Sequence, residues 1–161
     1  MQLRPIGVIH SPFREASGTP IQPSAADSVE GTVEIFPEFA AGLKDLEGFE
    51  RIWLLYWCDR ADFGPSGLVV SPYLDPQGKH GVFATRAPAR PNSIGISPVR
   101  LLEVSGNVLR VGDLDALDGS PLLDIKPYVT RFDSFQVTRS GWLEQVTEWR
   151  KMADSRFERK R

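Results

Sequence analysis

Residues 51 to 58 read Arg-Ile-Trp-Leu-Leu-Tyr-Trp-Cys and contain the longest apolar run in the chain. A run of this length predicts a β-strand, whereas a membrane-spanning helix needs about 20 apolar residues in succession. Because both faces of the run are apolar, we expect a central strand covered on both sides, with Trp53 and Trp57 filling the core. We therefore expect no membrane partner.

Further short strands are expected on both sides of this run, because β-branched and alternating segments recur between residues typical of turns. Ser105-Gly106-Asn107 tolerates positive φ, which predicts a hairpin between the last two of these strands. Many short strands with little helix favour a mainly β fold, a barrel or a sandwich. The expected strands are 6–9, 32–36, 68–70, 81–85, 99–104 and 108–111.

Helix is expected in two places. Pro37 can begin a short helix that runs through Leu43, because the first helical turn needs no proline N–H. After a plausible cap at Ser140, apolar residues recur at helical spacing and predict an amphipathic C-terminal helix. We therefore divide the chain into a β-barrel domain at 1–138 and a C-terminal helix with a basic tail at 139–161. The spaced apolar residues are Trp142, Val146, Trp149 and Ala153.

The composition is that of one ordinary globular domain, with 161 residues, 41% hydrophobic residues and a net charge of −2. The first residues lack the pattern of a secretory signal, and the single Cys58 cannot form an internal disulfide. Both features favour the reducing cytoplasm. One cysteine and two histidines are too few for a usual structural zinc site, so we expect no metal.

Two arginines and an asparagine lie in a proline-rich loop that follows residue 81. Prolines fix the backbone there, which suits the placement of Arg86, Arg90 and Asn92 in a binding site. An arginine can fork onto a phosphate or a carboxylate. The alternative is that the two arginines pair with Asp115 or Asp118 only to tie loops together.

Four aspartates and no basic residue occupy positions 113 to 124, around a turn signal at Asp118-Gly119. Aspartates in such a turn can accept hydrogen bonds from ribose hydroxyls or from an ammonium group. The alternative is a plain turn followed by a surface pair between Asp124 and Lys126. The phosphate-binding, dinucleotide-binding and hydrolase glycine motifs are absent from the sequence.

Several longer motifs in a fixed order resemble the TsaA-like (TrmO) family of S-adenosylmethionine-dependent tRNA methyltransferases. The resemblance covers roughly residues 4 to 134. It rests on Pro5-Ile-Gly-Val-Ile-His-Ser-Pro-Phe13, Gln22-Pro23, Glu47-Gly-Phe-Glu-Arg-Ile-Trp-Leu-Leu-Tyr56, Gly81-Val-Phe-Ala-Thr-Arg86, Arg90-Pro-Asn-Ser-Ile-Gly95 and Leu117-Asp-Gly-Ser-Pro-Leu-Leu-Asp-Ile-Lys-Pro-Tyr128.

This resemblance implies a small antiparallel β-barrel that binds S-adenosylmethionine and works as a homodimer on tRNA. The implied acceptor is the 6-nitrogen of a threonylcarbamoyl-modified adenosine just 3′ of the anticodon. Carried over by position, the cofactor-binding residues are Gln22, Pro23, Ser24, Asp59, Arg60, Arg86, Ile96, Ala116, Leu117, Asp118 and Gly119.

For catalysis we expect Arg86 to orient the methionine carboxylate or a substrate anion, and Asn92 to draw the hydrogen from the acceptor nitrogen. Arg90, Lys126 and Tyr128 are the expected substrate contacts, two cations for anionic groups and one ring for stacking. Many family members have a histidine in place of Asp59, and longer members carry a second C-terminal domain. The alternatives are a non-catalytic sensor of S-adenosylmethionine or tRNA-binding protein, and methylation of another nucleoside or a small amine.

Overall fold

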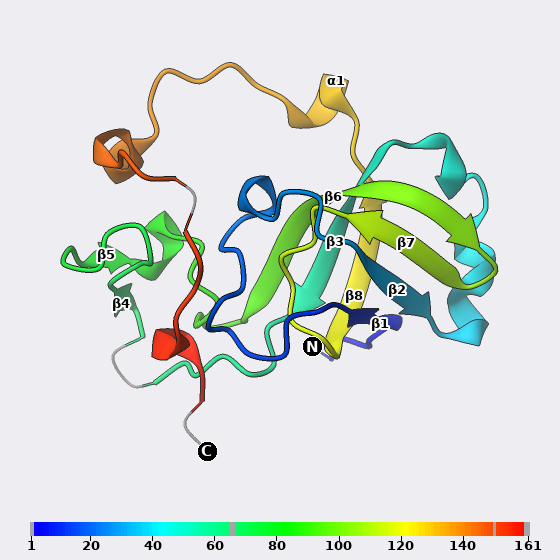
Figure 1. The fold of residues 1–161 in the computed structure, drawn as a ribbon, viewed down its shortest axis with the longest axis horizontal. Helices are drawn as coiled ribbons and strands as arrows, with labels where there is room; N and C mark the ends of the chain where they lie inside the picture. Colours follow the sequence, from blue (N-terminus) through cyan, green and yellow to red (C-terminus); the bar gives the residue numbers. More distant parts are fainter. Residues whose placement is uncertain (1, 65–66, 150, 160–161) are drawn as a thin grey trace.

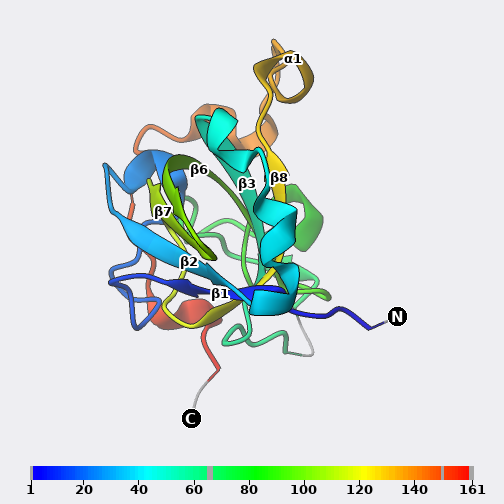
Figure 2. The same ribbon diagram turned by 90° about the vertical axis from the view of Figure 1, so that its right-hand side faces the viewer.

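The computed structural model describes residues 2–64, 67–149 and 151–159. Six antiparallel strands close into a barrel in the order β1-β2-β7-β6-β3-β8, with β8 returning to β1 (Figures 1 and 2). The mainly β barrel predicted from the sequence is confirmed. The barrel strands are β1 (Gly7–His10), β2 (Gly31–Ile35), β3 (Arg51–Trp57), β6 (Ile94–Ser105), β7 (Val108–Gly112) and β8 (Ser120–Pro127), and a separate small sheet pairs β4 (Val69–Val70) with β5 (His80–Gly81).

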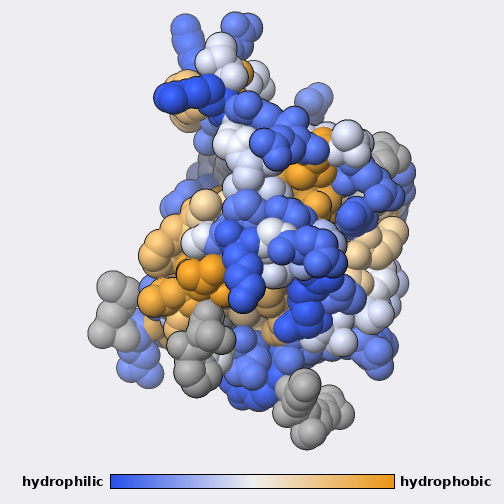
Figure 3. Space-filling model, turned by 90° about the vertical axis from the view of Figure 1, so that its left-hand side faces the viewer, coloured by the Kyte–Doolittle hydropathy of each residue, from blue (hydrophilic) through white to orange (hydrophobic). Residues whose placement is uncertain are grey.

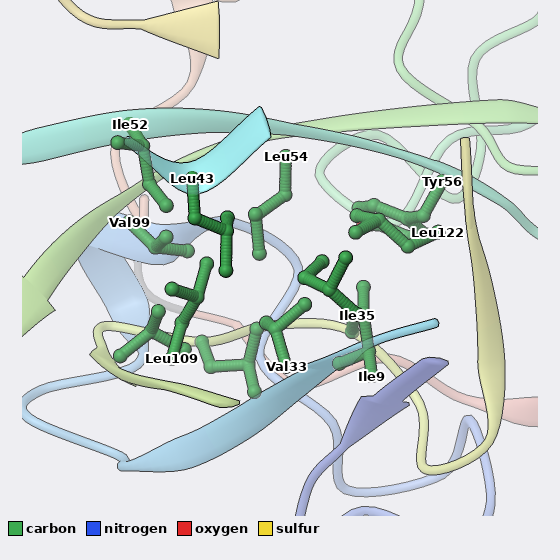
Figure 4. Close-up of a cluster of buried hydrophobic side chains, with 13 residues drawn as sticks. Ile9, Val33, Ile35, Leu43, Ile52, Leu54, Tyr56, Val99, Leu109 and Leu122 are labelled. Atoms are coloured by element: carbon green, nitrogen blue, oxygen red, sulfur yellow. The ribbon is translucent and has the colours of Figure 1, made fainter. Parts of the chain in front are cut away.

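Strand β3 lies between β6 and β8 and sends alternate side chains into the barrel. Ile52, Leu54 and Tyr56 are buried in the core, together with residues from the other strands (Figure 4). The outer face is covered less than predicted, because only loops and side chains lie outside a barrel wall. Trp53 packs against Tyr128 with ring centroids 5.5 Å apart, whereas Trp57 is 49% exposed, so its prediction as a core residue was wrong.

One predicted strand boundary and one predicted strand differ from the structure, and one strand of the structure was not predicted. Strand β6 begins at Ile94 rather than at residue 99, with Pro98 inside it, so the barrel wall includes part of the proline-rich segment. Residues 81–85 do not form a strand: after β5 they form a 3₁₀ helix, η4 (Val82–Ala84), which Thr85 closes by donating to the Val82 carbonyl. Strand β8 was not predicted, because its prolines and acidic residue are typical of turns.

The predicted β6–β7 hairpin is confirmed, and Gly106 at its turn has φ of +61°. The predicted helix from Pro37 to Leu43 is present as a 3₁₀ helix, η2 (Pro37–Leu43), whose Leu43 closes one end of the core. Two further 3₁₀ turns, η1 (Pro23–Ala25) and η3 (Leu46–Gly48), shape the connections beside β2 and β3. None of the helices in the described residues is long and apolar enough to cross a membrane.

The amphipathic helix expected over residues 140–153 is not observed. The described part of the chain after β8 holds only short turns, α1 (Thr130–Asp133), η5 (Gly141–Gln145) and η6 (Ser155–Phe157), joined by non-helical chain (Figure 1). Its apolar residues contact separate parts of the protein instead of forming one apolar stripe. Trp142 stacks on His80 and donates to the Ala84 carbonyl at 2.8 Å, whereas Phe157 is buried in a second small core.

The described residues of the C-terminal tail, 139–149 and 151–159, are fastened to the body by backbone hydrogen bonds. Ala153 exchanges bonds with the loop after β1, accepting from Gly18 and donating to the Thr19 carbonyl. Further along, Asp62 donates to the Phe157 carbonyl, so the tail also follows the chain that leaves β3. In Figure 1 the tail descends beside the small β4–β5 sheet, away from the far end of the barrel.

Candidate functional site

A cavity of about 830 Å³ lies between the open end of the barrel and the tail. This volume falls in the range of roughly 300–1,000 Å³ that is typical of small-molecule sites. Its walls come from the loop after β1, the adjoining ends of β3 and β6, the proline-rich loop, the aspartate-rich turn and the tail. Figure 3 shows the face formed by the tail and the small sheet, where apolar patches are separated by charged side chains.

The proline-rich loop is held in shape by Arg90. One guanidinium nitrogen of Arg90 donates to the carbonyls of Val82, Thr85 and Ala87, the shortest bond being 2.9 Å to Thr85. Arg90 therefore ties the loop to itself. Arg86 lies on the same loop. Its guanidinium donates to the Gln22 side chain at 3.1 Å and forms no ion pair with a described residue. The predicted alternative, in which these arginines pair with Asp115 or Asp118, is not observed.

The aspartate-rich turn presents its backbone and apolar side chains to the cavity. The carboxylate of Asp118 points away, accepting from the Ser11 N–H at 3.2 Å and from Arg14 at 3.0 Å. Its carbonyl accepts from the Arg60 guanidinium, which also donates to the Arg14 carbonyl at 2.8 Å. Gly119 has φ of +80°, a conformation that L side chains rarely adopt. This bracing leaves Ala116 and Leu117 as part of the cavity wall.

Asp115 lies at the floor of the cavity and is the most perturbed acid of the described residues. Burial raises the pKa of its carboxyl to about 7, although a hydrogen bond from Ser97 and the charge of Arg86 oppose that rise. Ser97 donates to Asp115 Oδ1 at 2.5 Å, and its Oγ lies 3.3 Å from the Tyr56 hydroxyl. Three elements thus meet here, β3, β6 and the aspartate-rich turn.

Two other ionisable groups of the floor stay neutral near pH 7. Burial, followed by the charges of Asp115 and Asp59, raises the pKa of the Cys58 thiol to about 12. Burial also raises the pKa of Tyr56 well above its ordinary value. This environment argues against Cys58 as a nucleophile, because only a thiolate attacks efficiently.

The cavity brings together most of the residues that the resemblance implied for cofactor binding, and Arg90 besides. Pro23 is buried at the start of η1 just behind the wall, and Asp118 and Gly119 brace the turn from outside. Those in the cavity wall are Gln22, Ser24, Asp59, Arg60, Arg86, Arg90, Ile96, Ala116 and Leu117.

Three predicted residues lie elsewhere. Asn92 is exposed on the outer side of its loop and is not part of the cavity wall. Lys126 pairs with Asp124 at 2.8 Å, as the alternative interpretation of that segment predicted. Tyr128 follows the far end of β8 and packs on Trp53, about 10 Å along β3 from Tyr56 at the usual rise per residue.

Sequence reasoning named Asp115 as an alternative ion-pair partner of the arginines, but it left out Ser97, which bonds to Asp115 from behind the wall, and the tail part of the wall. Ser97 had a weak signal, because it is a polar residue at an inward position of a strand. The tail residues had none, because their pattern indicated a helix. They are Trp142, Leu143, Trp149, Ala153, Phe157 and Glu158. Among the described residues no cluster of three or more histidine, cysteine or acidic side chains could hold a metal.

The model of the tRNA-methyltransferase O N-terminal domain matches residues 8–134. A probable S-adenosyl-L-methionine-binding protein of Pyrococcus abyssi is 63% identical over 142 residues, which are 88% of this chain and 76% of that protein. A tRNA (adenine(37)-N6)-methyltransferase of Escherichia coli is 38% identical over 152 residues, 90% of this chain and 65% of the enzyme. A crystal structure of TrmO from Pseudomonas aeruginosa has a TM-score of 0.73 at 37% identity, covering 91% of this chain and 62% of that one. The chain thus spans less than two thirds of the length of these last two proteins.

Proposed function

Because this chain belongs to the tRNA-methyltransferase O N-terminal domain family, we propose that it transfers a methyl group from S-adenosylmethionine to an adenosine N6 in tRNA. The observation that carries the proposal is the cavity itself. It joins the proline-rich arginine loop and the aspartate-rich turn, two segments that are separate in the sequence. The activity of the Escherichia coli relative supports the reaction class, and the description of the archaeal relative as a binding protein for S-adenosyl-L-methionine supports the methyl donor.

The residues in the cavity wall fit this methyl donor. Ile96, Ala116 and Leu117 offer an apolar surface and backbone groups for an adenine, while the Arg86 guanidinium suits a carboxylate. S-adenosylmethionine, when bound, supplies an electrophilic methyl group on a sulfonium. The cavity therefore matches S-adenosylmethionine in charge and polarity as well as in size.

The protein's part in such a transfer is to align two reactants and to keep water out. Well-oriented reactants can save roughly 7–11 kcal/mol of the barrier. The Cys58 thiol, whose pKa is raised to about 12, stays protonated at the cavity floor and is not available as a covalent carrier of the methyl group. We therefore propose direct transfer to the acceptor nitrogen, with no enzyme-bound intermediate.

The proposed acceptor is the threonylcarbamoyl-modified adenosine next to the anticodon. Its acylated nitrogen carries a moderately acidic hydrogen, which leaves as a proton to solvent as the N–CH3 bond forms and the S–CH3 bond of the donor breaks. Asn92, Lys126 and Tyr128 lie outside the cavity wall, so their proposed contacts are with the tRNA around the reacting nucleoside. Arg90 would act there mainly by holding its loop.

We also propose that the active form is a homodimer. Four large apolar side chains that line the cavity are exposed in the single chain: Phe83 at 78%, Trp149 at 50%, Ile96 at 48% and Ile94 at 40%. A second copy over this opening would cover them and complete the exclusion of water. Light scattering tests this point, since a fully active monomer would contradict it.

The test of the proposed function is transfer of labelled methyl from S-adenosylmethionine to tRNA, followed by digestion to nucleosides. tRNA with the threonylcarbamoyl group and the same tRNA without it are compared. We expect label in N6-methylated threonylcarbamoyladenosine, lost on Arg86→Ala. Arg110→Ala is the matched control, because Arg110 pairs with Glu30 and Glu103 on the barrel surface and lies outside the cavity wall.

A second function is supported by the names of the archaeal relatives, which are described as S-adenosyl-L-methionine-binding proteins. A sensor would retain the labelled donor saturably and place no label in any nucleoside. Label in a different nucleoside, or in a small amine, would instead identify another acceptor. Each of these results would contradict the proposed reaction while leaving the donor site in place.

A further inference from the structure

The Asp115 carboxylate lines the cavity without a cation in contact. Ser97 is the one described side chain that donates a hydrogen bond to it, at 2.5 Å, and no described lysine, arginine or histidine forms an ion pair with it. Ser97 is completely buried and is itself in contact with the Tyr56 hydroxyl at 3.3 Å. One carboxylate oxygen is thus fixed by the barrel, and the group as a whole faces the space where a ligand would lie.

An ionised carboxylate in such a position is costly unless a positive group approaches it. The groups that act on it across the floor are Arg86, which attracts it from the cavity wall, and the neutral Tyr56 and Cys58. Arg86 is occupied by Gln22 and stays out of contact. Asp115 and Arg86 are thus an anion and a cation of the cavity wall that are not joined to each other. The wall also holds Asp59, and it holds Arg60, Arg90 and Glu158, whose side chains bond to backbone groups.

An α-amino acid matches this arrangement, because it carries an ammonium and a carboxylate on the same carbon. Resting on the proposed function, we infer that Asp115 binds the α-ammonium group of the methyl donor while Arg86 takes its carboxylate. The ammonium can donate up to three hydrogen bonds, whereas the sulfonium has none to give. Asp115 then has a partner for the oxygen that Ser97 leaves free. The pair would select ligands that carry a free amino acid end.

The test compares two ligands that share the adenosine and sulfur but differ in the amino acid end. S-adenosylhomocysteine has this end, and 5′-methylthioadenosine lacks it. Their dissociation constants are measured by calorimetry at pH 8 for the wild type and for Asp115→Asn. Asn keeps the shape and an oxygen for Ser97 but no charge. We expect at least a tenfold loss for S-adenosylhomocysteine and less than a twofold change for 5′-methylthioadenosine.

Asp45→Asn is the matched control, since Asp45 is exposed in a loop outside the cavity wall and its substitution changes charge equally. Thermal unfolding of each variant shows that it is folded. The pH dependence of binding to the wild type is a second measurement. We expect the affinity for S-adenosylhomocysteine to fall as the pH is lowered below about 7, because Asp115 then takes up a proton. Asp115→Asn removes this dependence.

The outcomes separate the inference from the proposed function. Equal losses for both ligands, or no loss for either, overturn the role of Asp115 while the donor site stands. Failure of the wild type to bind any of these ligands overturns the proposed function and the inference together.

Discussion

Ser97 Oγ lies 2.5 Å from Asp115 Oδ1, and this contact joins the inward face of β6 to the floor of the cavity. The bond stabilises the charged form of Asp115, against the effect of burial, which raises the pKa of the carboxyl to about 7. Ser97, a residue of the barrel wall, therefore helps to set the charge of Asp115 in the cavity at physiological pH. Three of the following predictions concern this contact and its support.

Ser97→Ala should raise the pKa of Asp115 further, because it removes a hydrogen bond to the ionised form. The measurement is a carbon-13 NMR titration of the Asp115 carboxyl carbon in both proteins. Ser105→Ala is the control, since Ser105 lies at the exposed end of the same strand. An unchanged or lower titration midpoint would show that the bond does not act on Asp115.

Asp115→Asn should stabilise the fold at pH 8 by roughly 1–3 kcal/mol and by little at pH 4. An acid whose pKa is raised on folding binds more protons in the folded state between its two pKa values. The wild type therefore loses stability as the pH rises from about 4 to 7, and the variant does not. Urea unfolding across this range gives the comparison. A variant less stable than the wild type at pH 8 would mean that the carboxylate has a stabilising partner.

Gly95→Ala should destabilise the protein by about 1–3 kcal/mol and weaken ligand binding. A Cβ at Gly95 would lie 2.5 Å from ring atoms of Tyr56, whose rigid ring packs over that glycine. Displacing the ring disturbs the Tyr56–Ser97 contact below the cavity. Gly42→Ala, where a Cβ meets open space, serves as the control. Equal unfolding free energies for the two variants would argue against this packing.

Phe157→Ala should loosen the tail before it affects the barrel. Phe157 is 8% exposed and packs edge-on against Tyr73, with centroids 5.1 Å apart. Amide hydrogen exchange should accelerate at Gly18, Ile21 and Asp62, which donate to tail carbonyls, while barrel amides stay protected. Phe135→Ala, at a residue 77% exposed, should change neither set. Unchanged exchange at the three amides would show that the tail is held independently of Phe157.

The barrel was predictable because its signals are local. Alternation in β2, the apolar run of β3 and the glycine at the β6–β7 turn each indicate their element without help from distant residues. Strand β8 was not predictable, because Pro121 and Pro127 are residues that usually interrupt a strand. Both are accommodated because β8 takes its partners from β1 and β3, which lie far away in the sequence.

The site was predictable in part for the same reason. The motifs that carry Arg86 and Leu117 are continuous, so the resemblance predicts that both belong to one site, and both line the cavity. Lys126 is placed outside by the register of β8 against β3, which no single segment encodes. The tail forms its wall through backbone pairing at Met152 and Glu158, and such pairing depends little on side-chain type. This is why its helical spacing was misleading.

The central claim is that the cavity between the arginine loop and the aspartate-rich turn holds the methyl donor. A crystal structure with S-adenosylhomocysteine tests it most directly. The account predicts the amino acid end between Arg86 and Asp115 and the adenosine beside Ala116 and Leu117. Density for the ligand at another place on the chain, with this cavity empty, would contradict it.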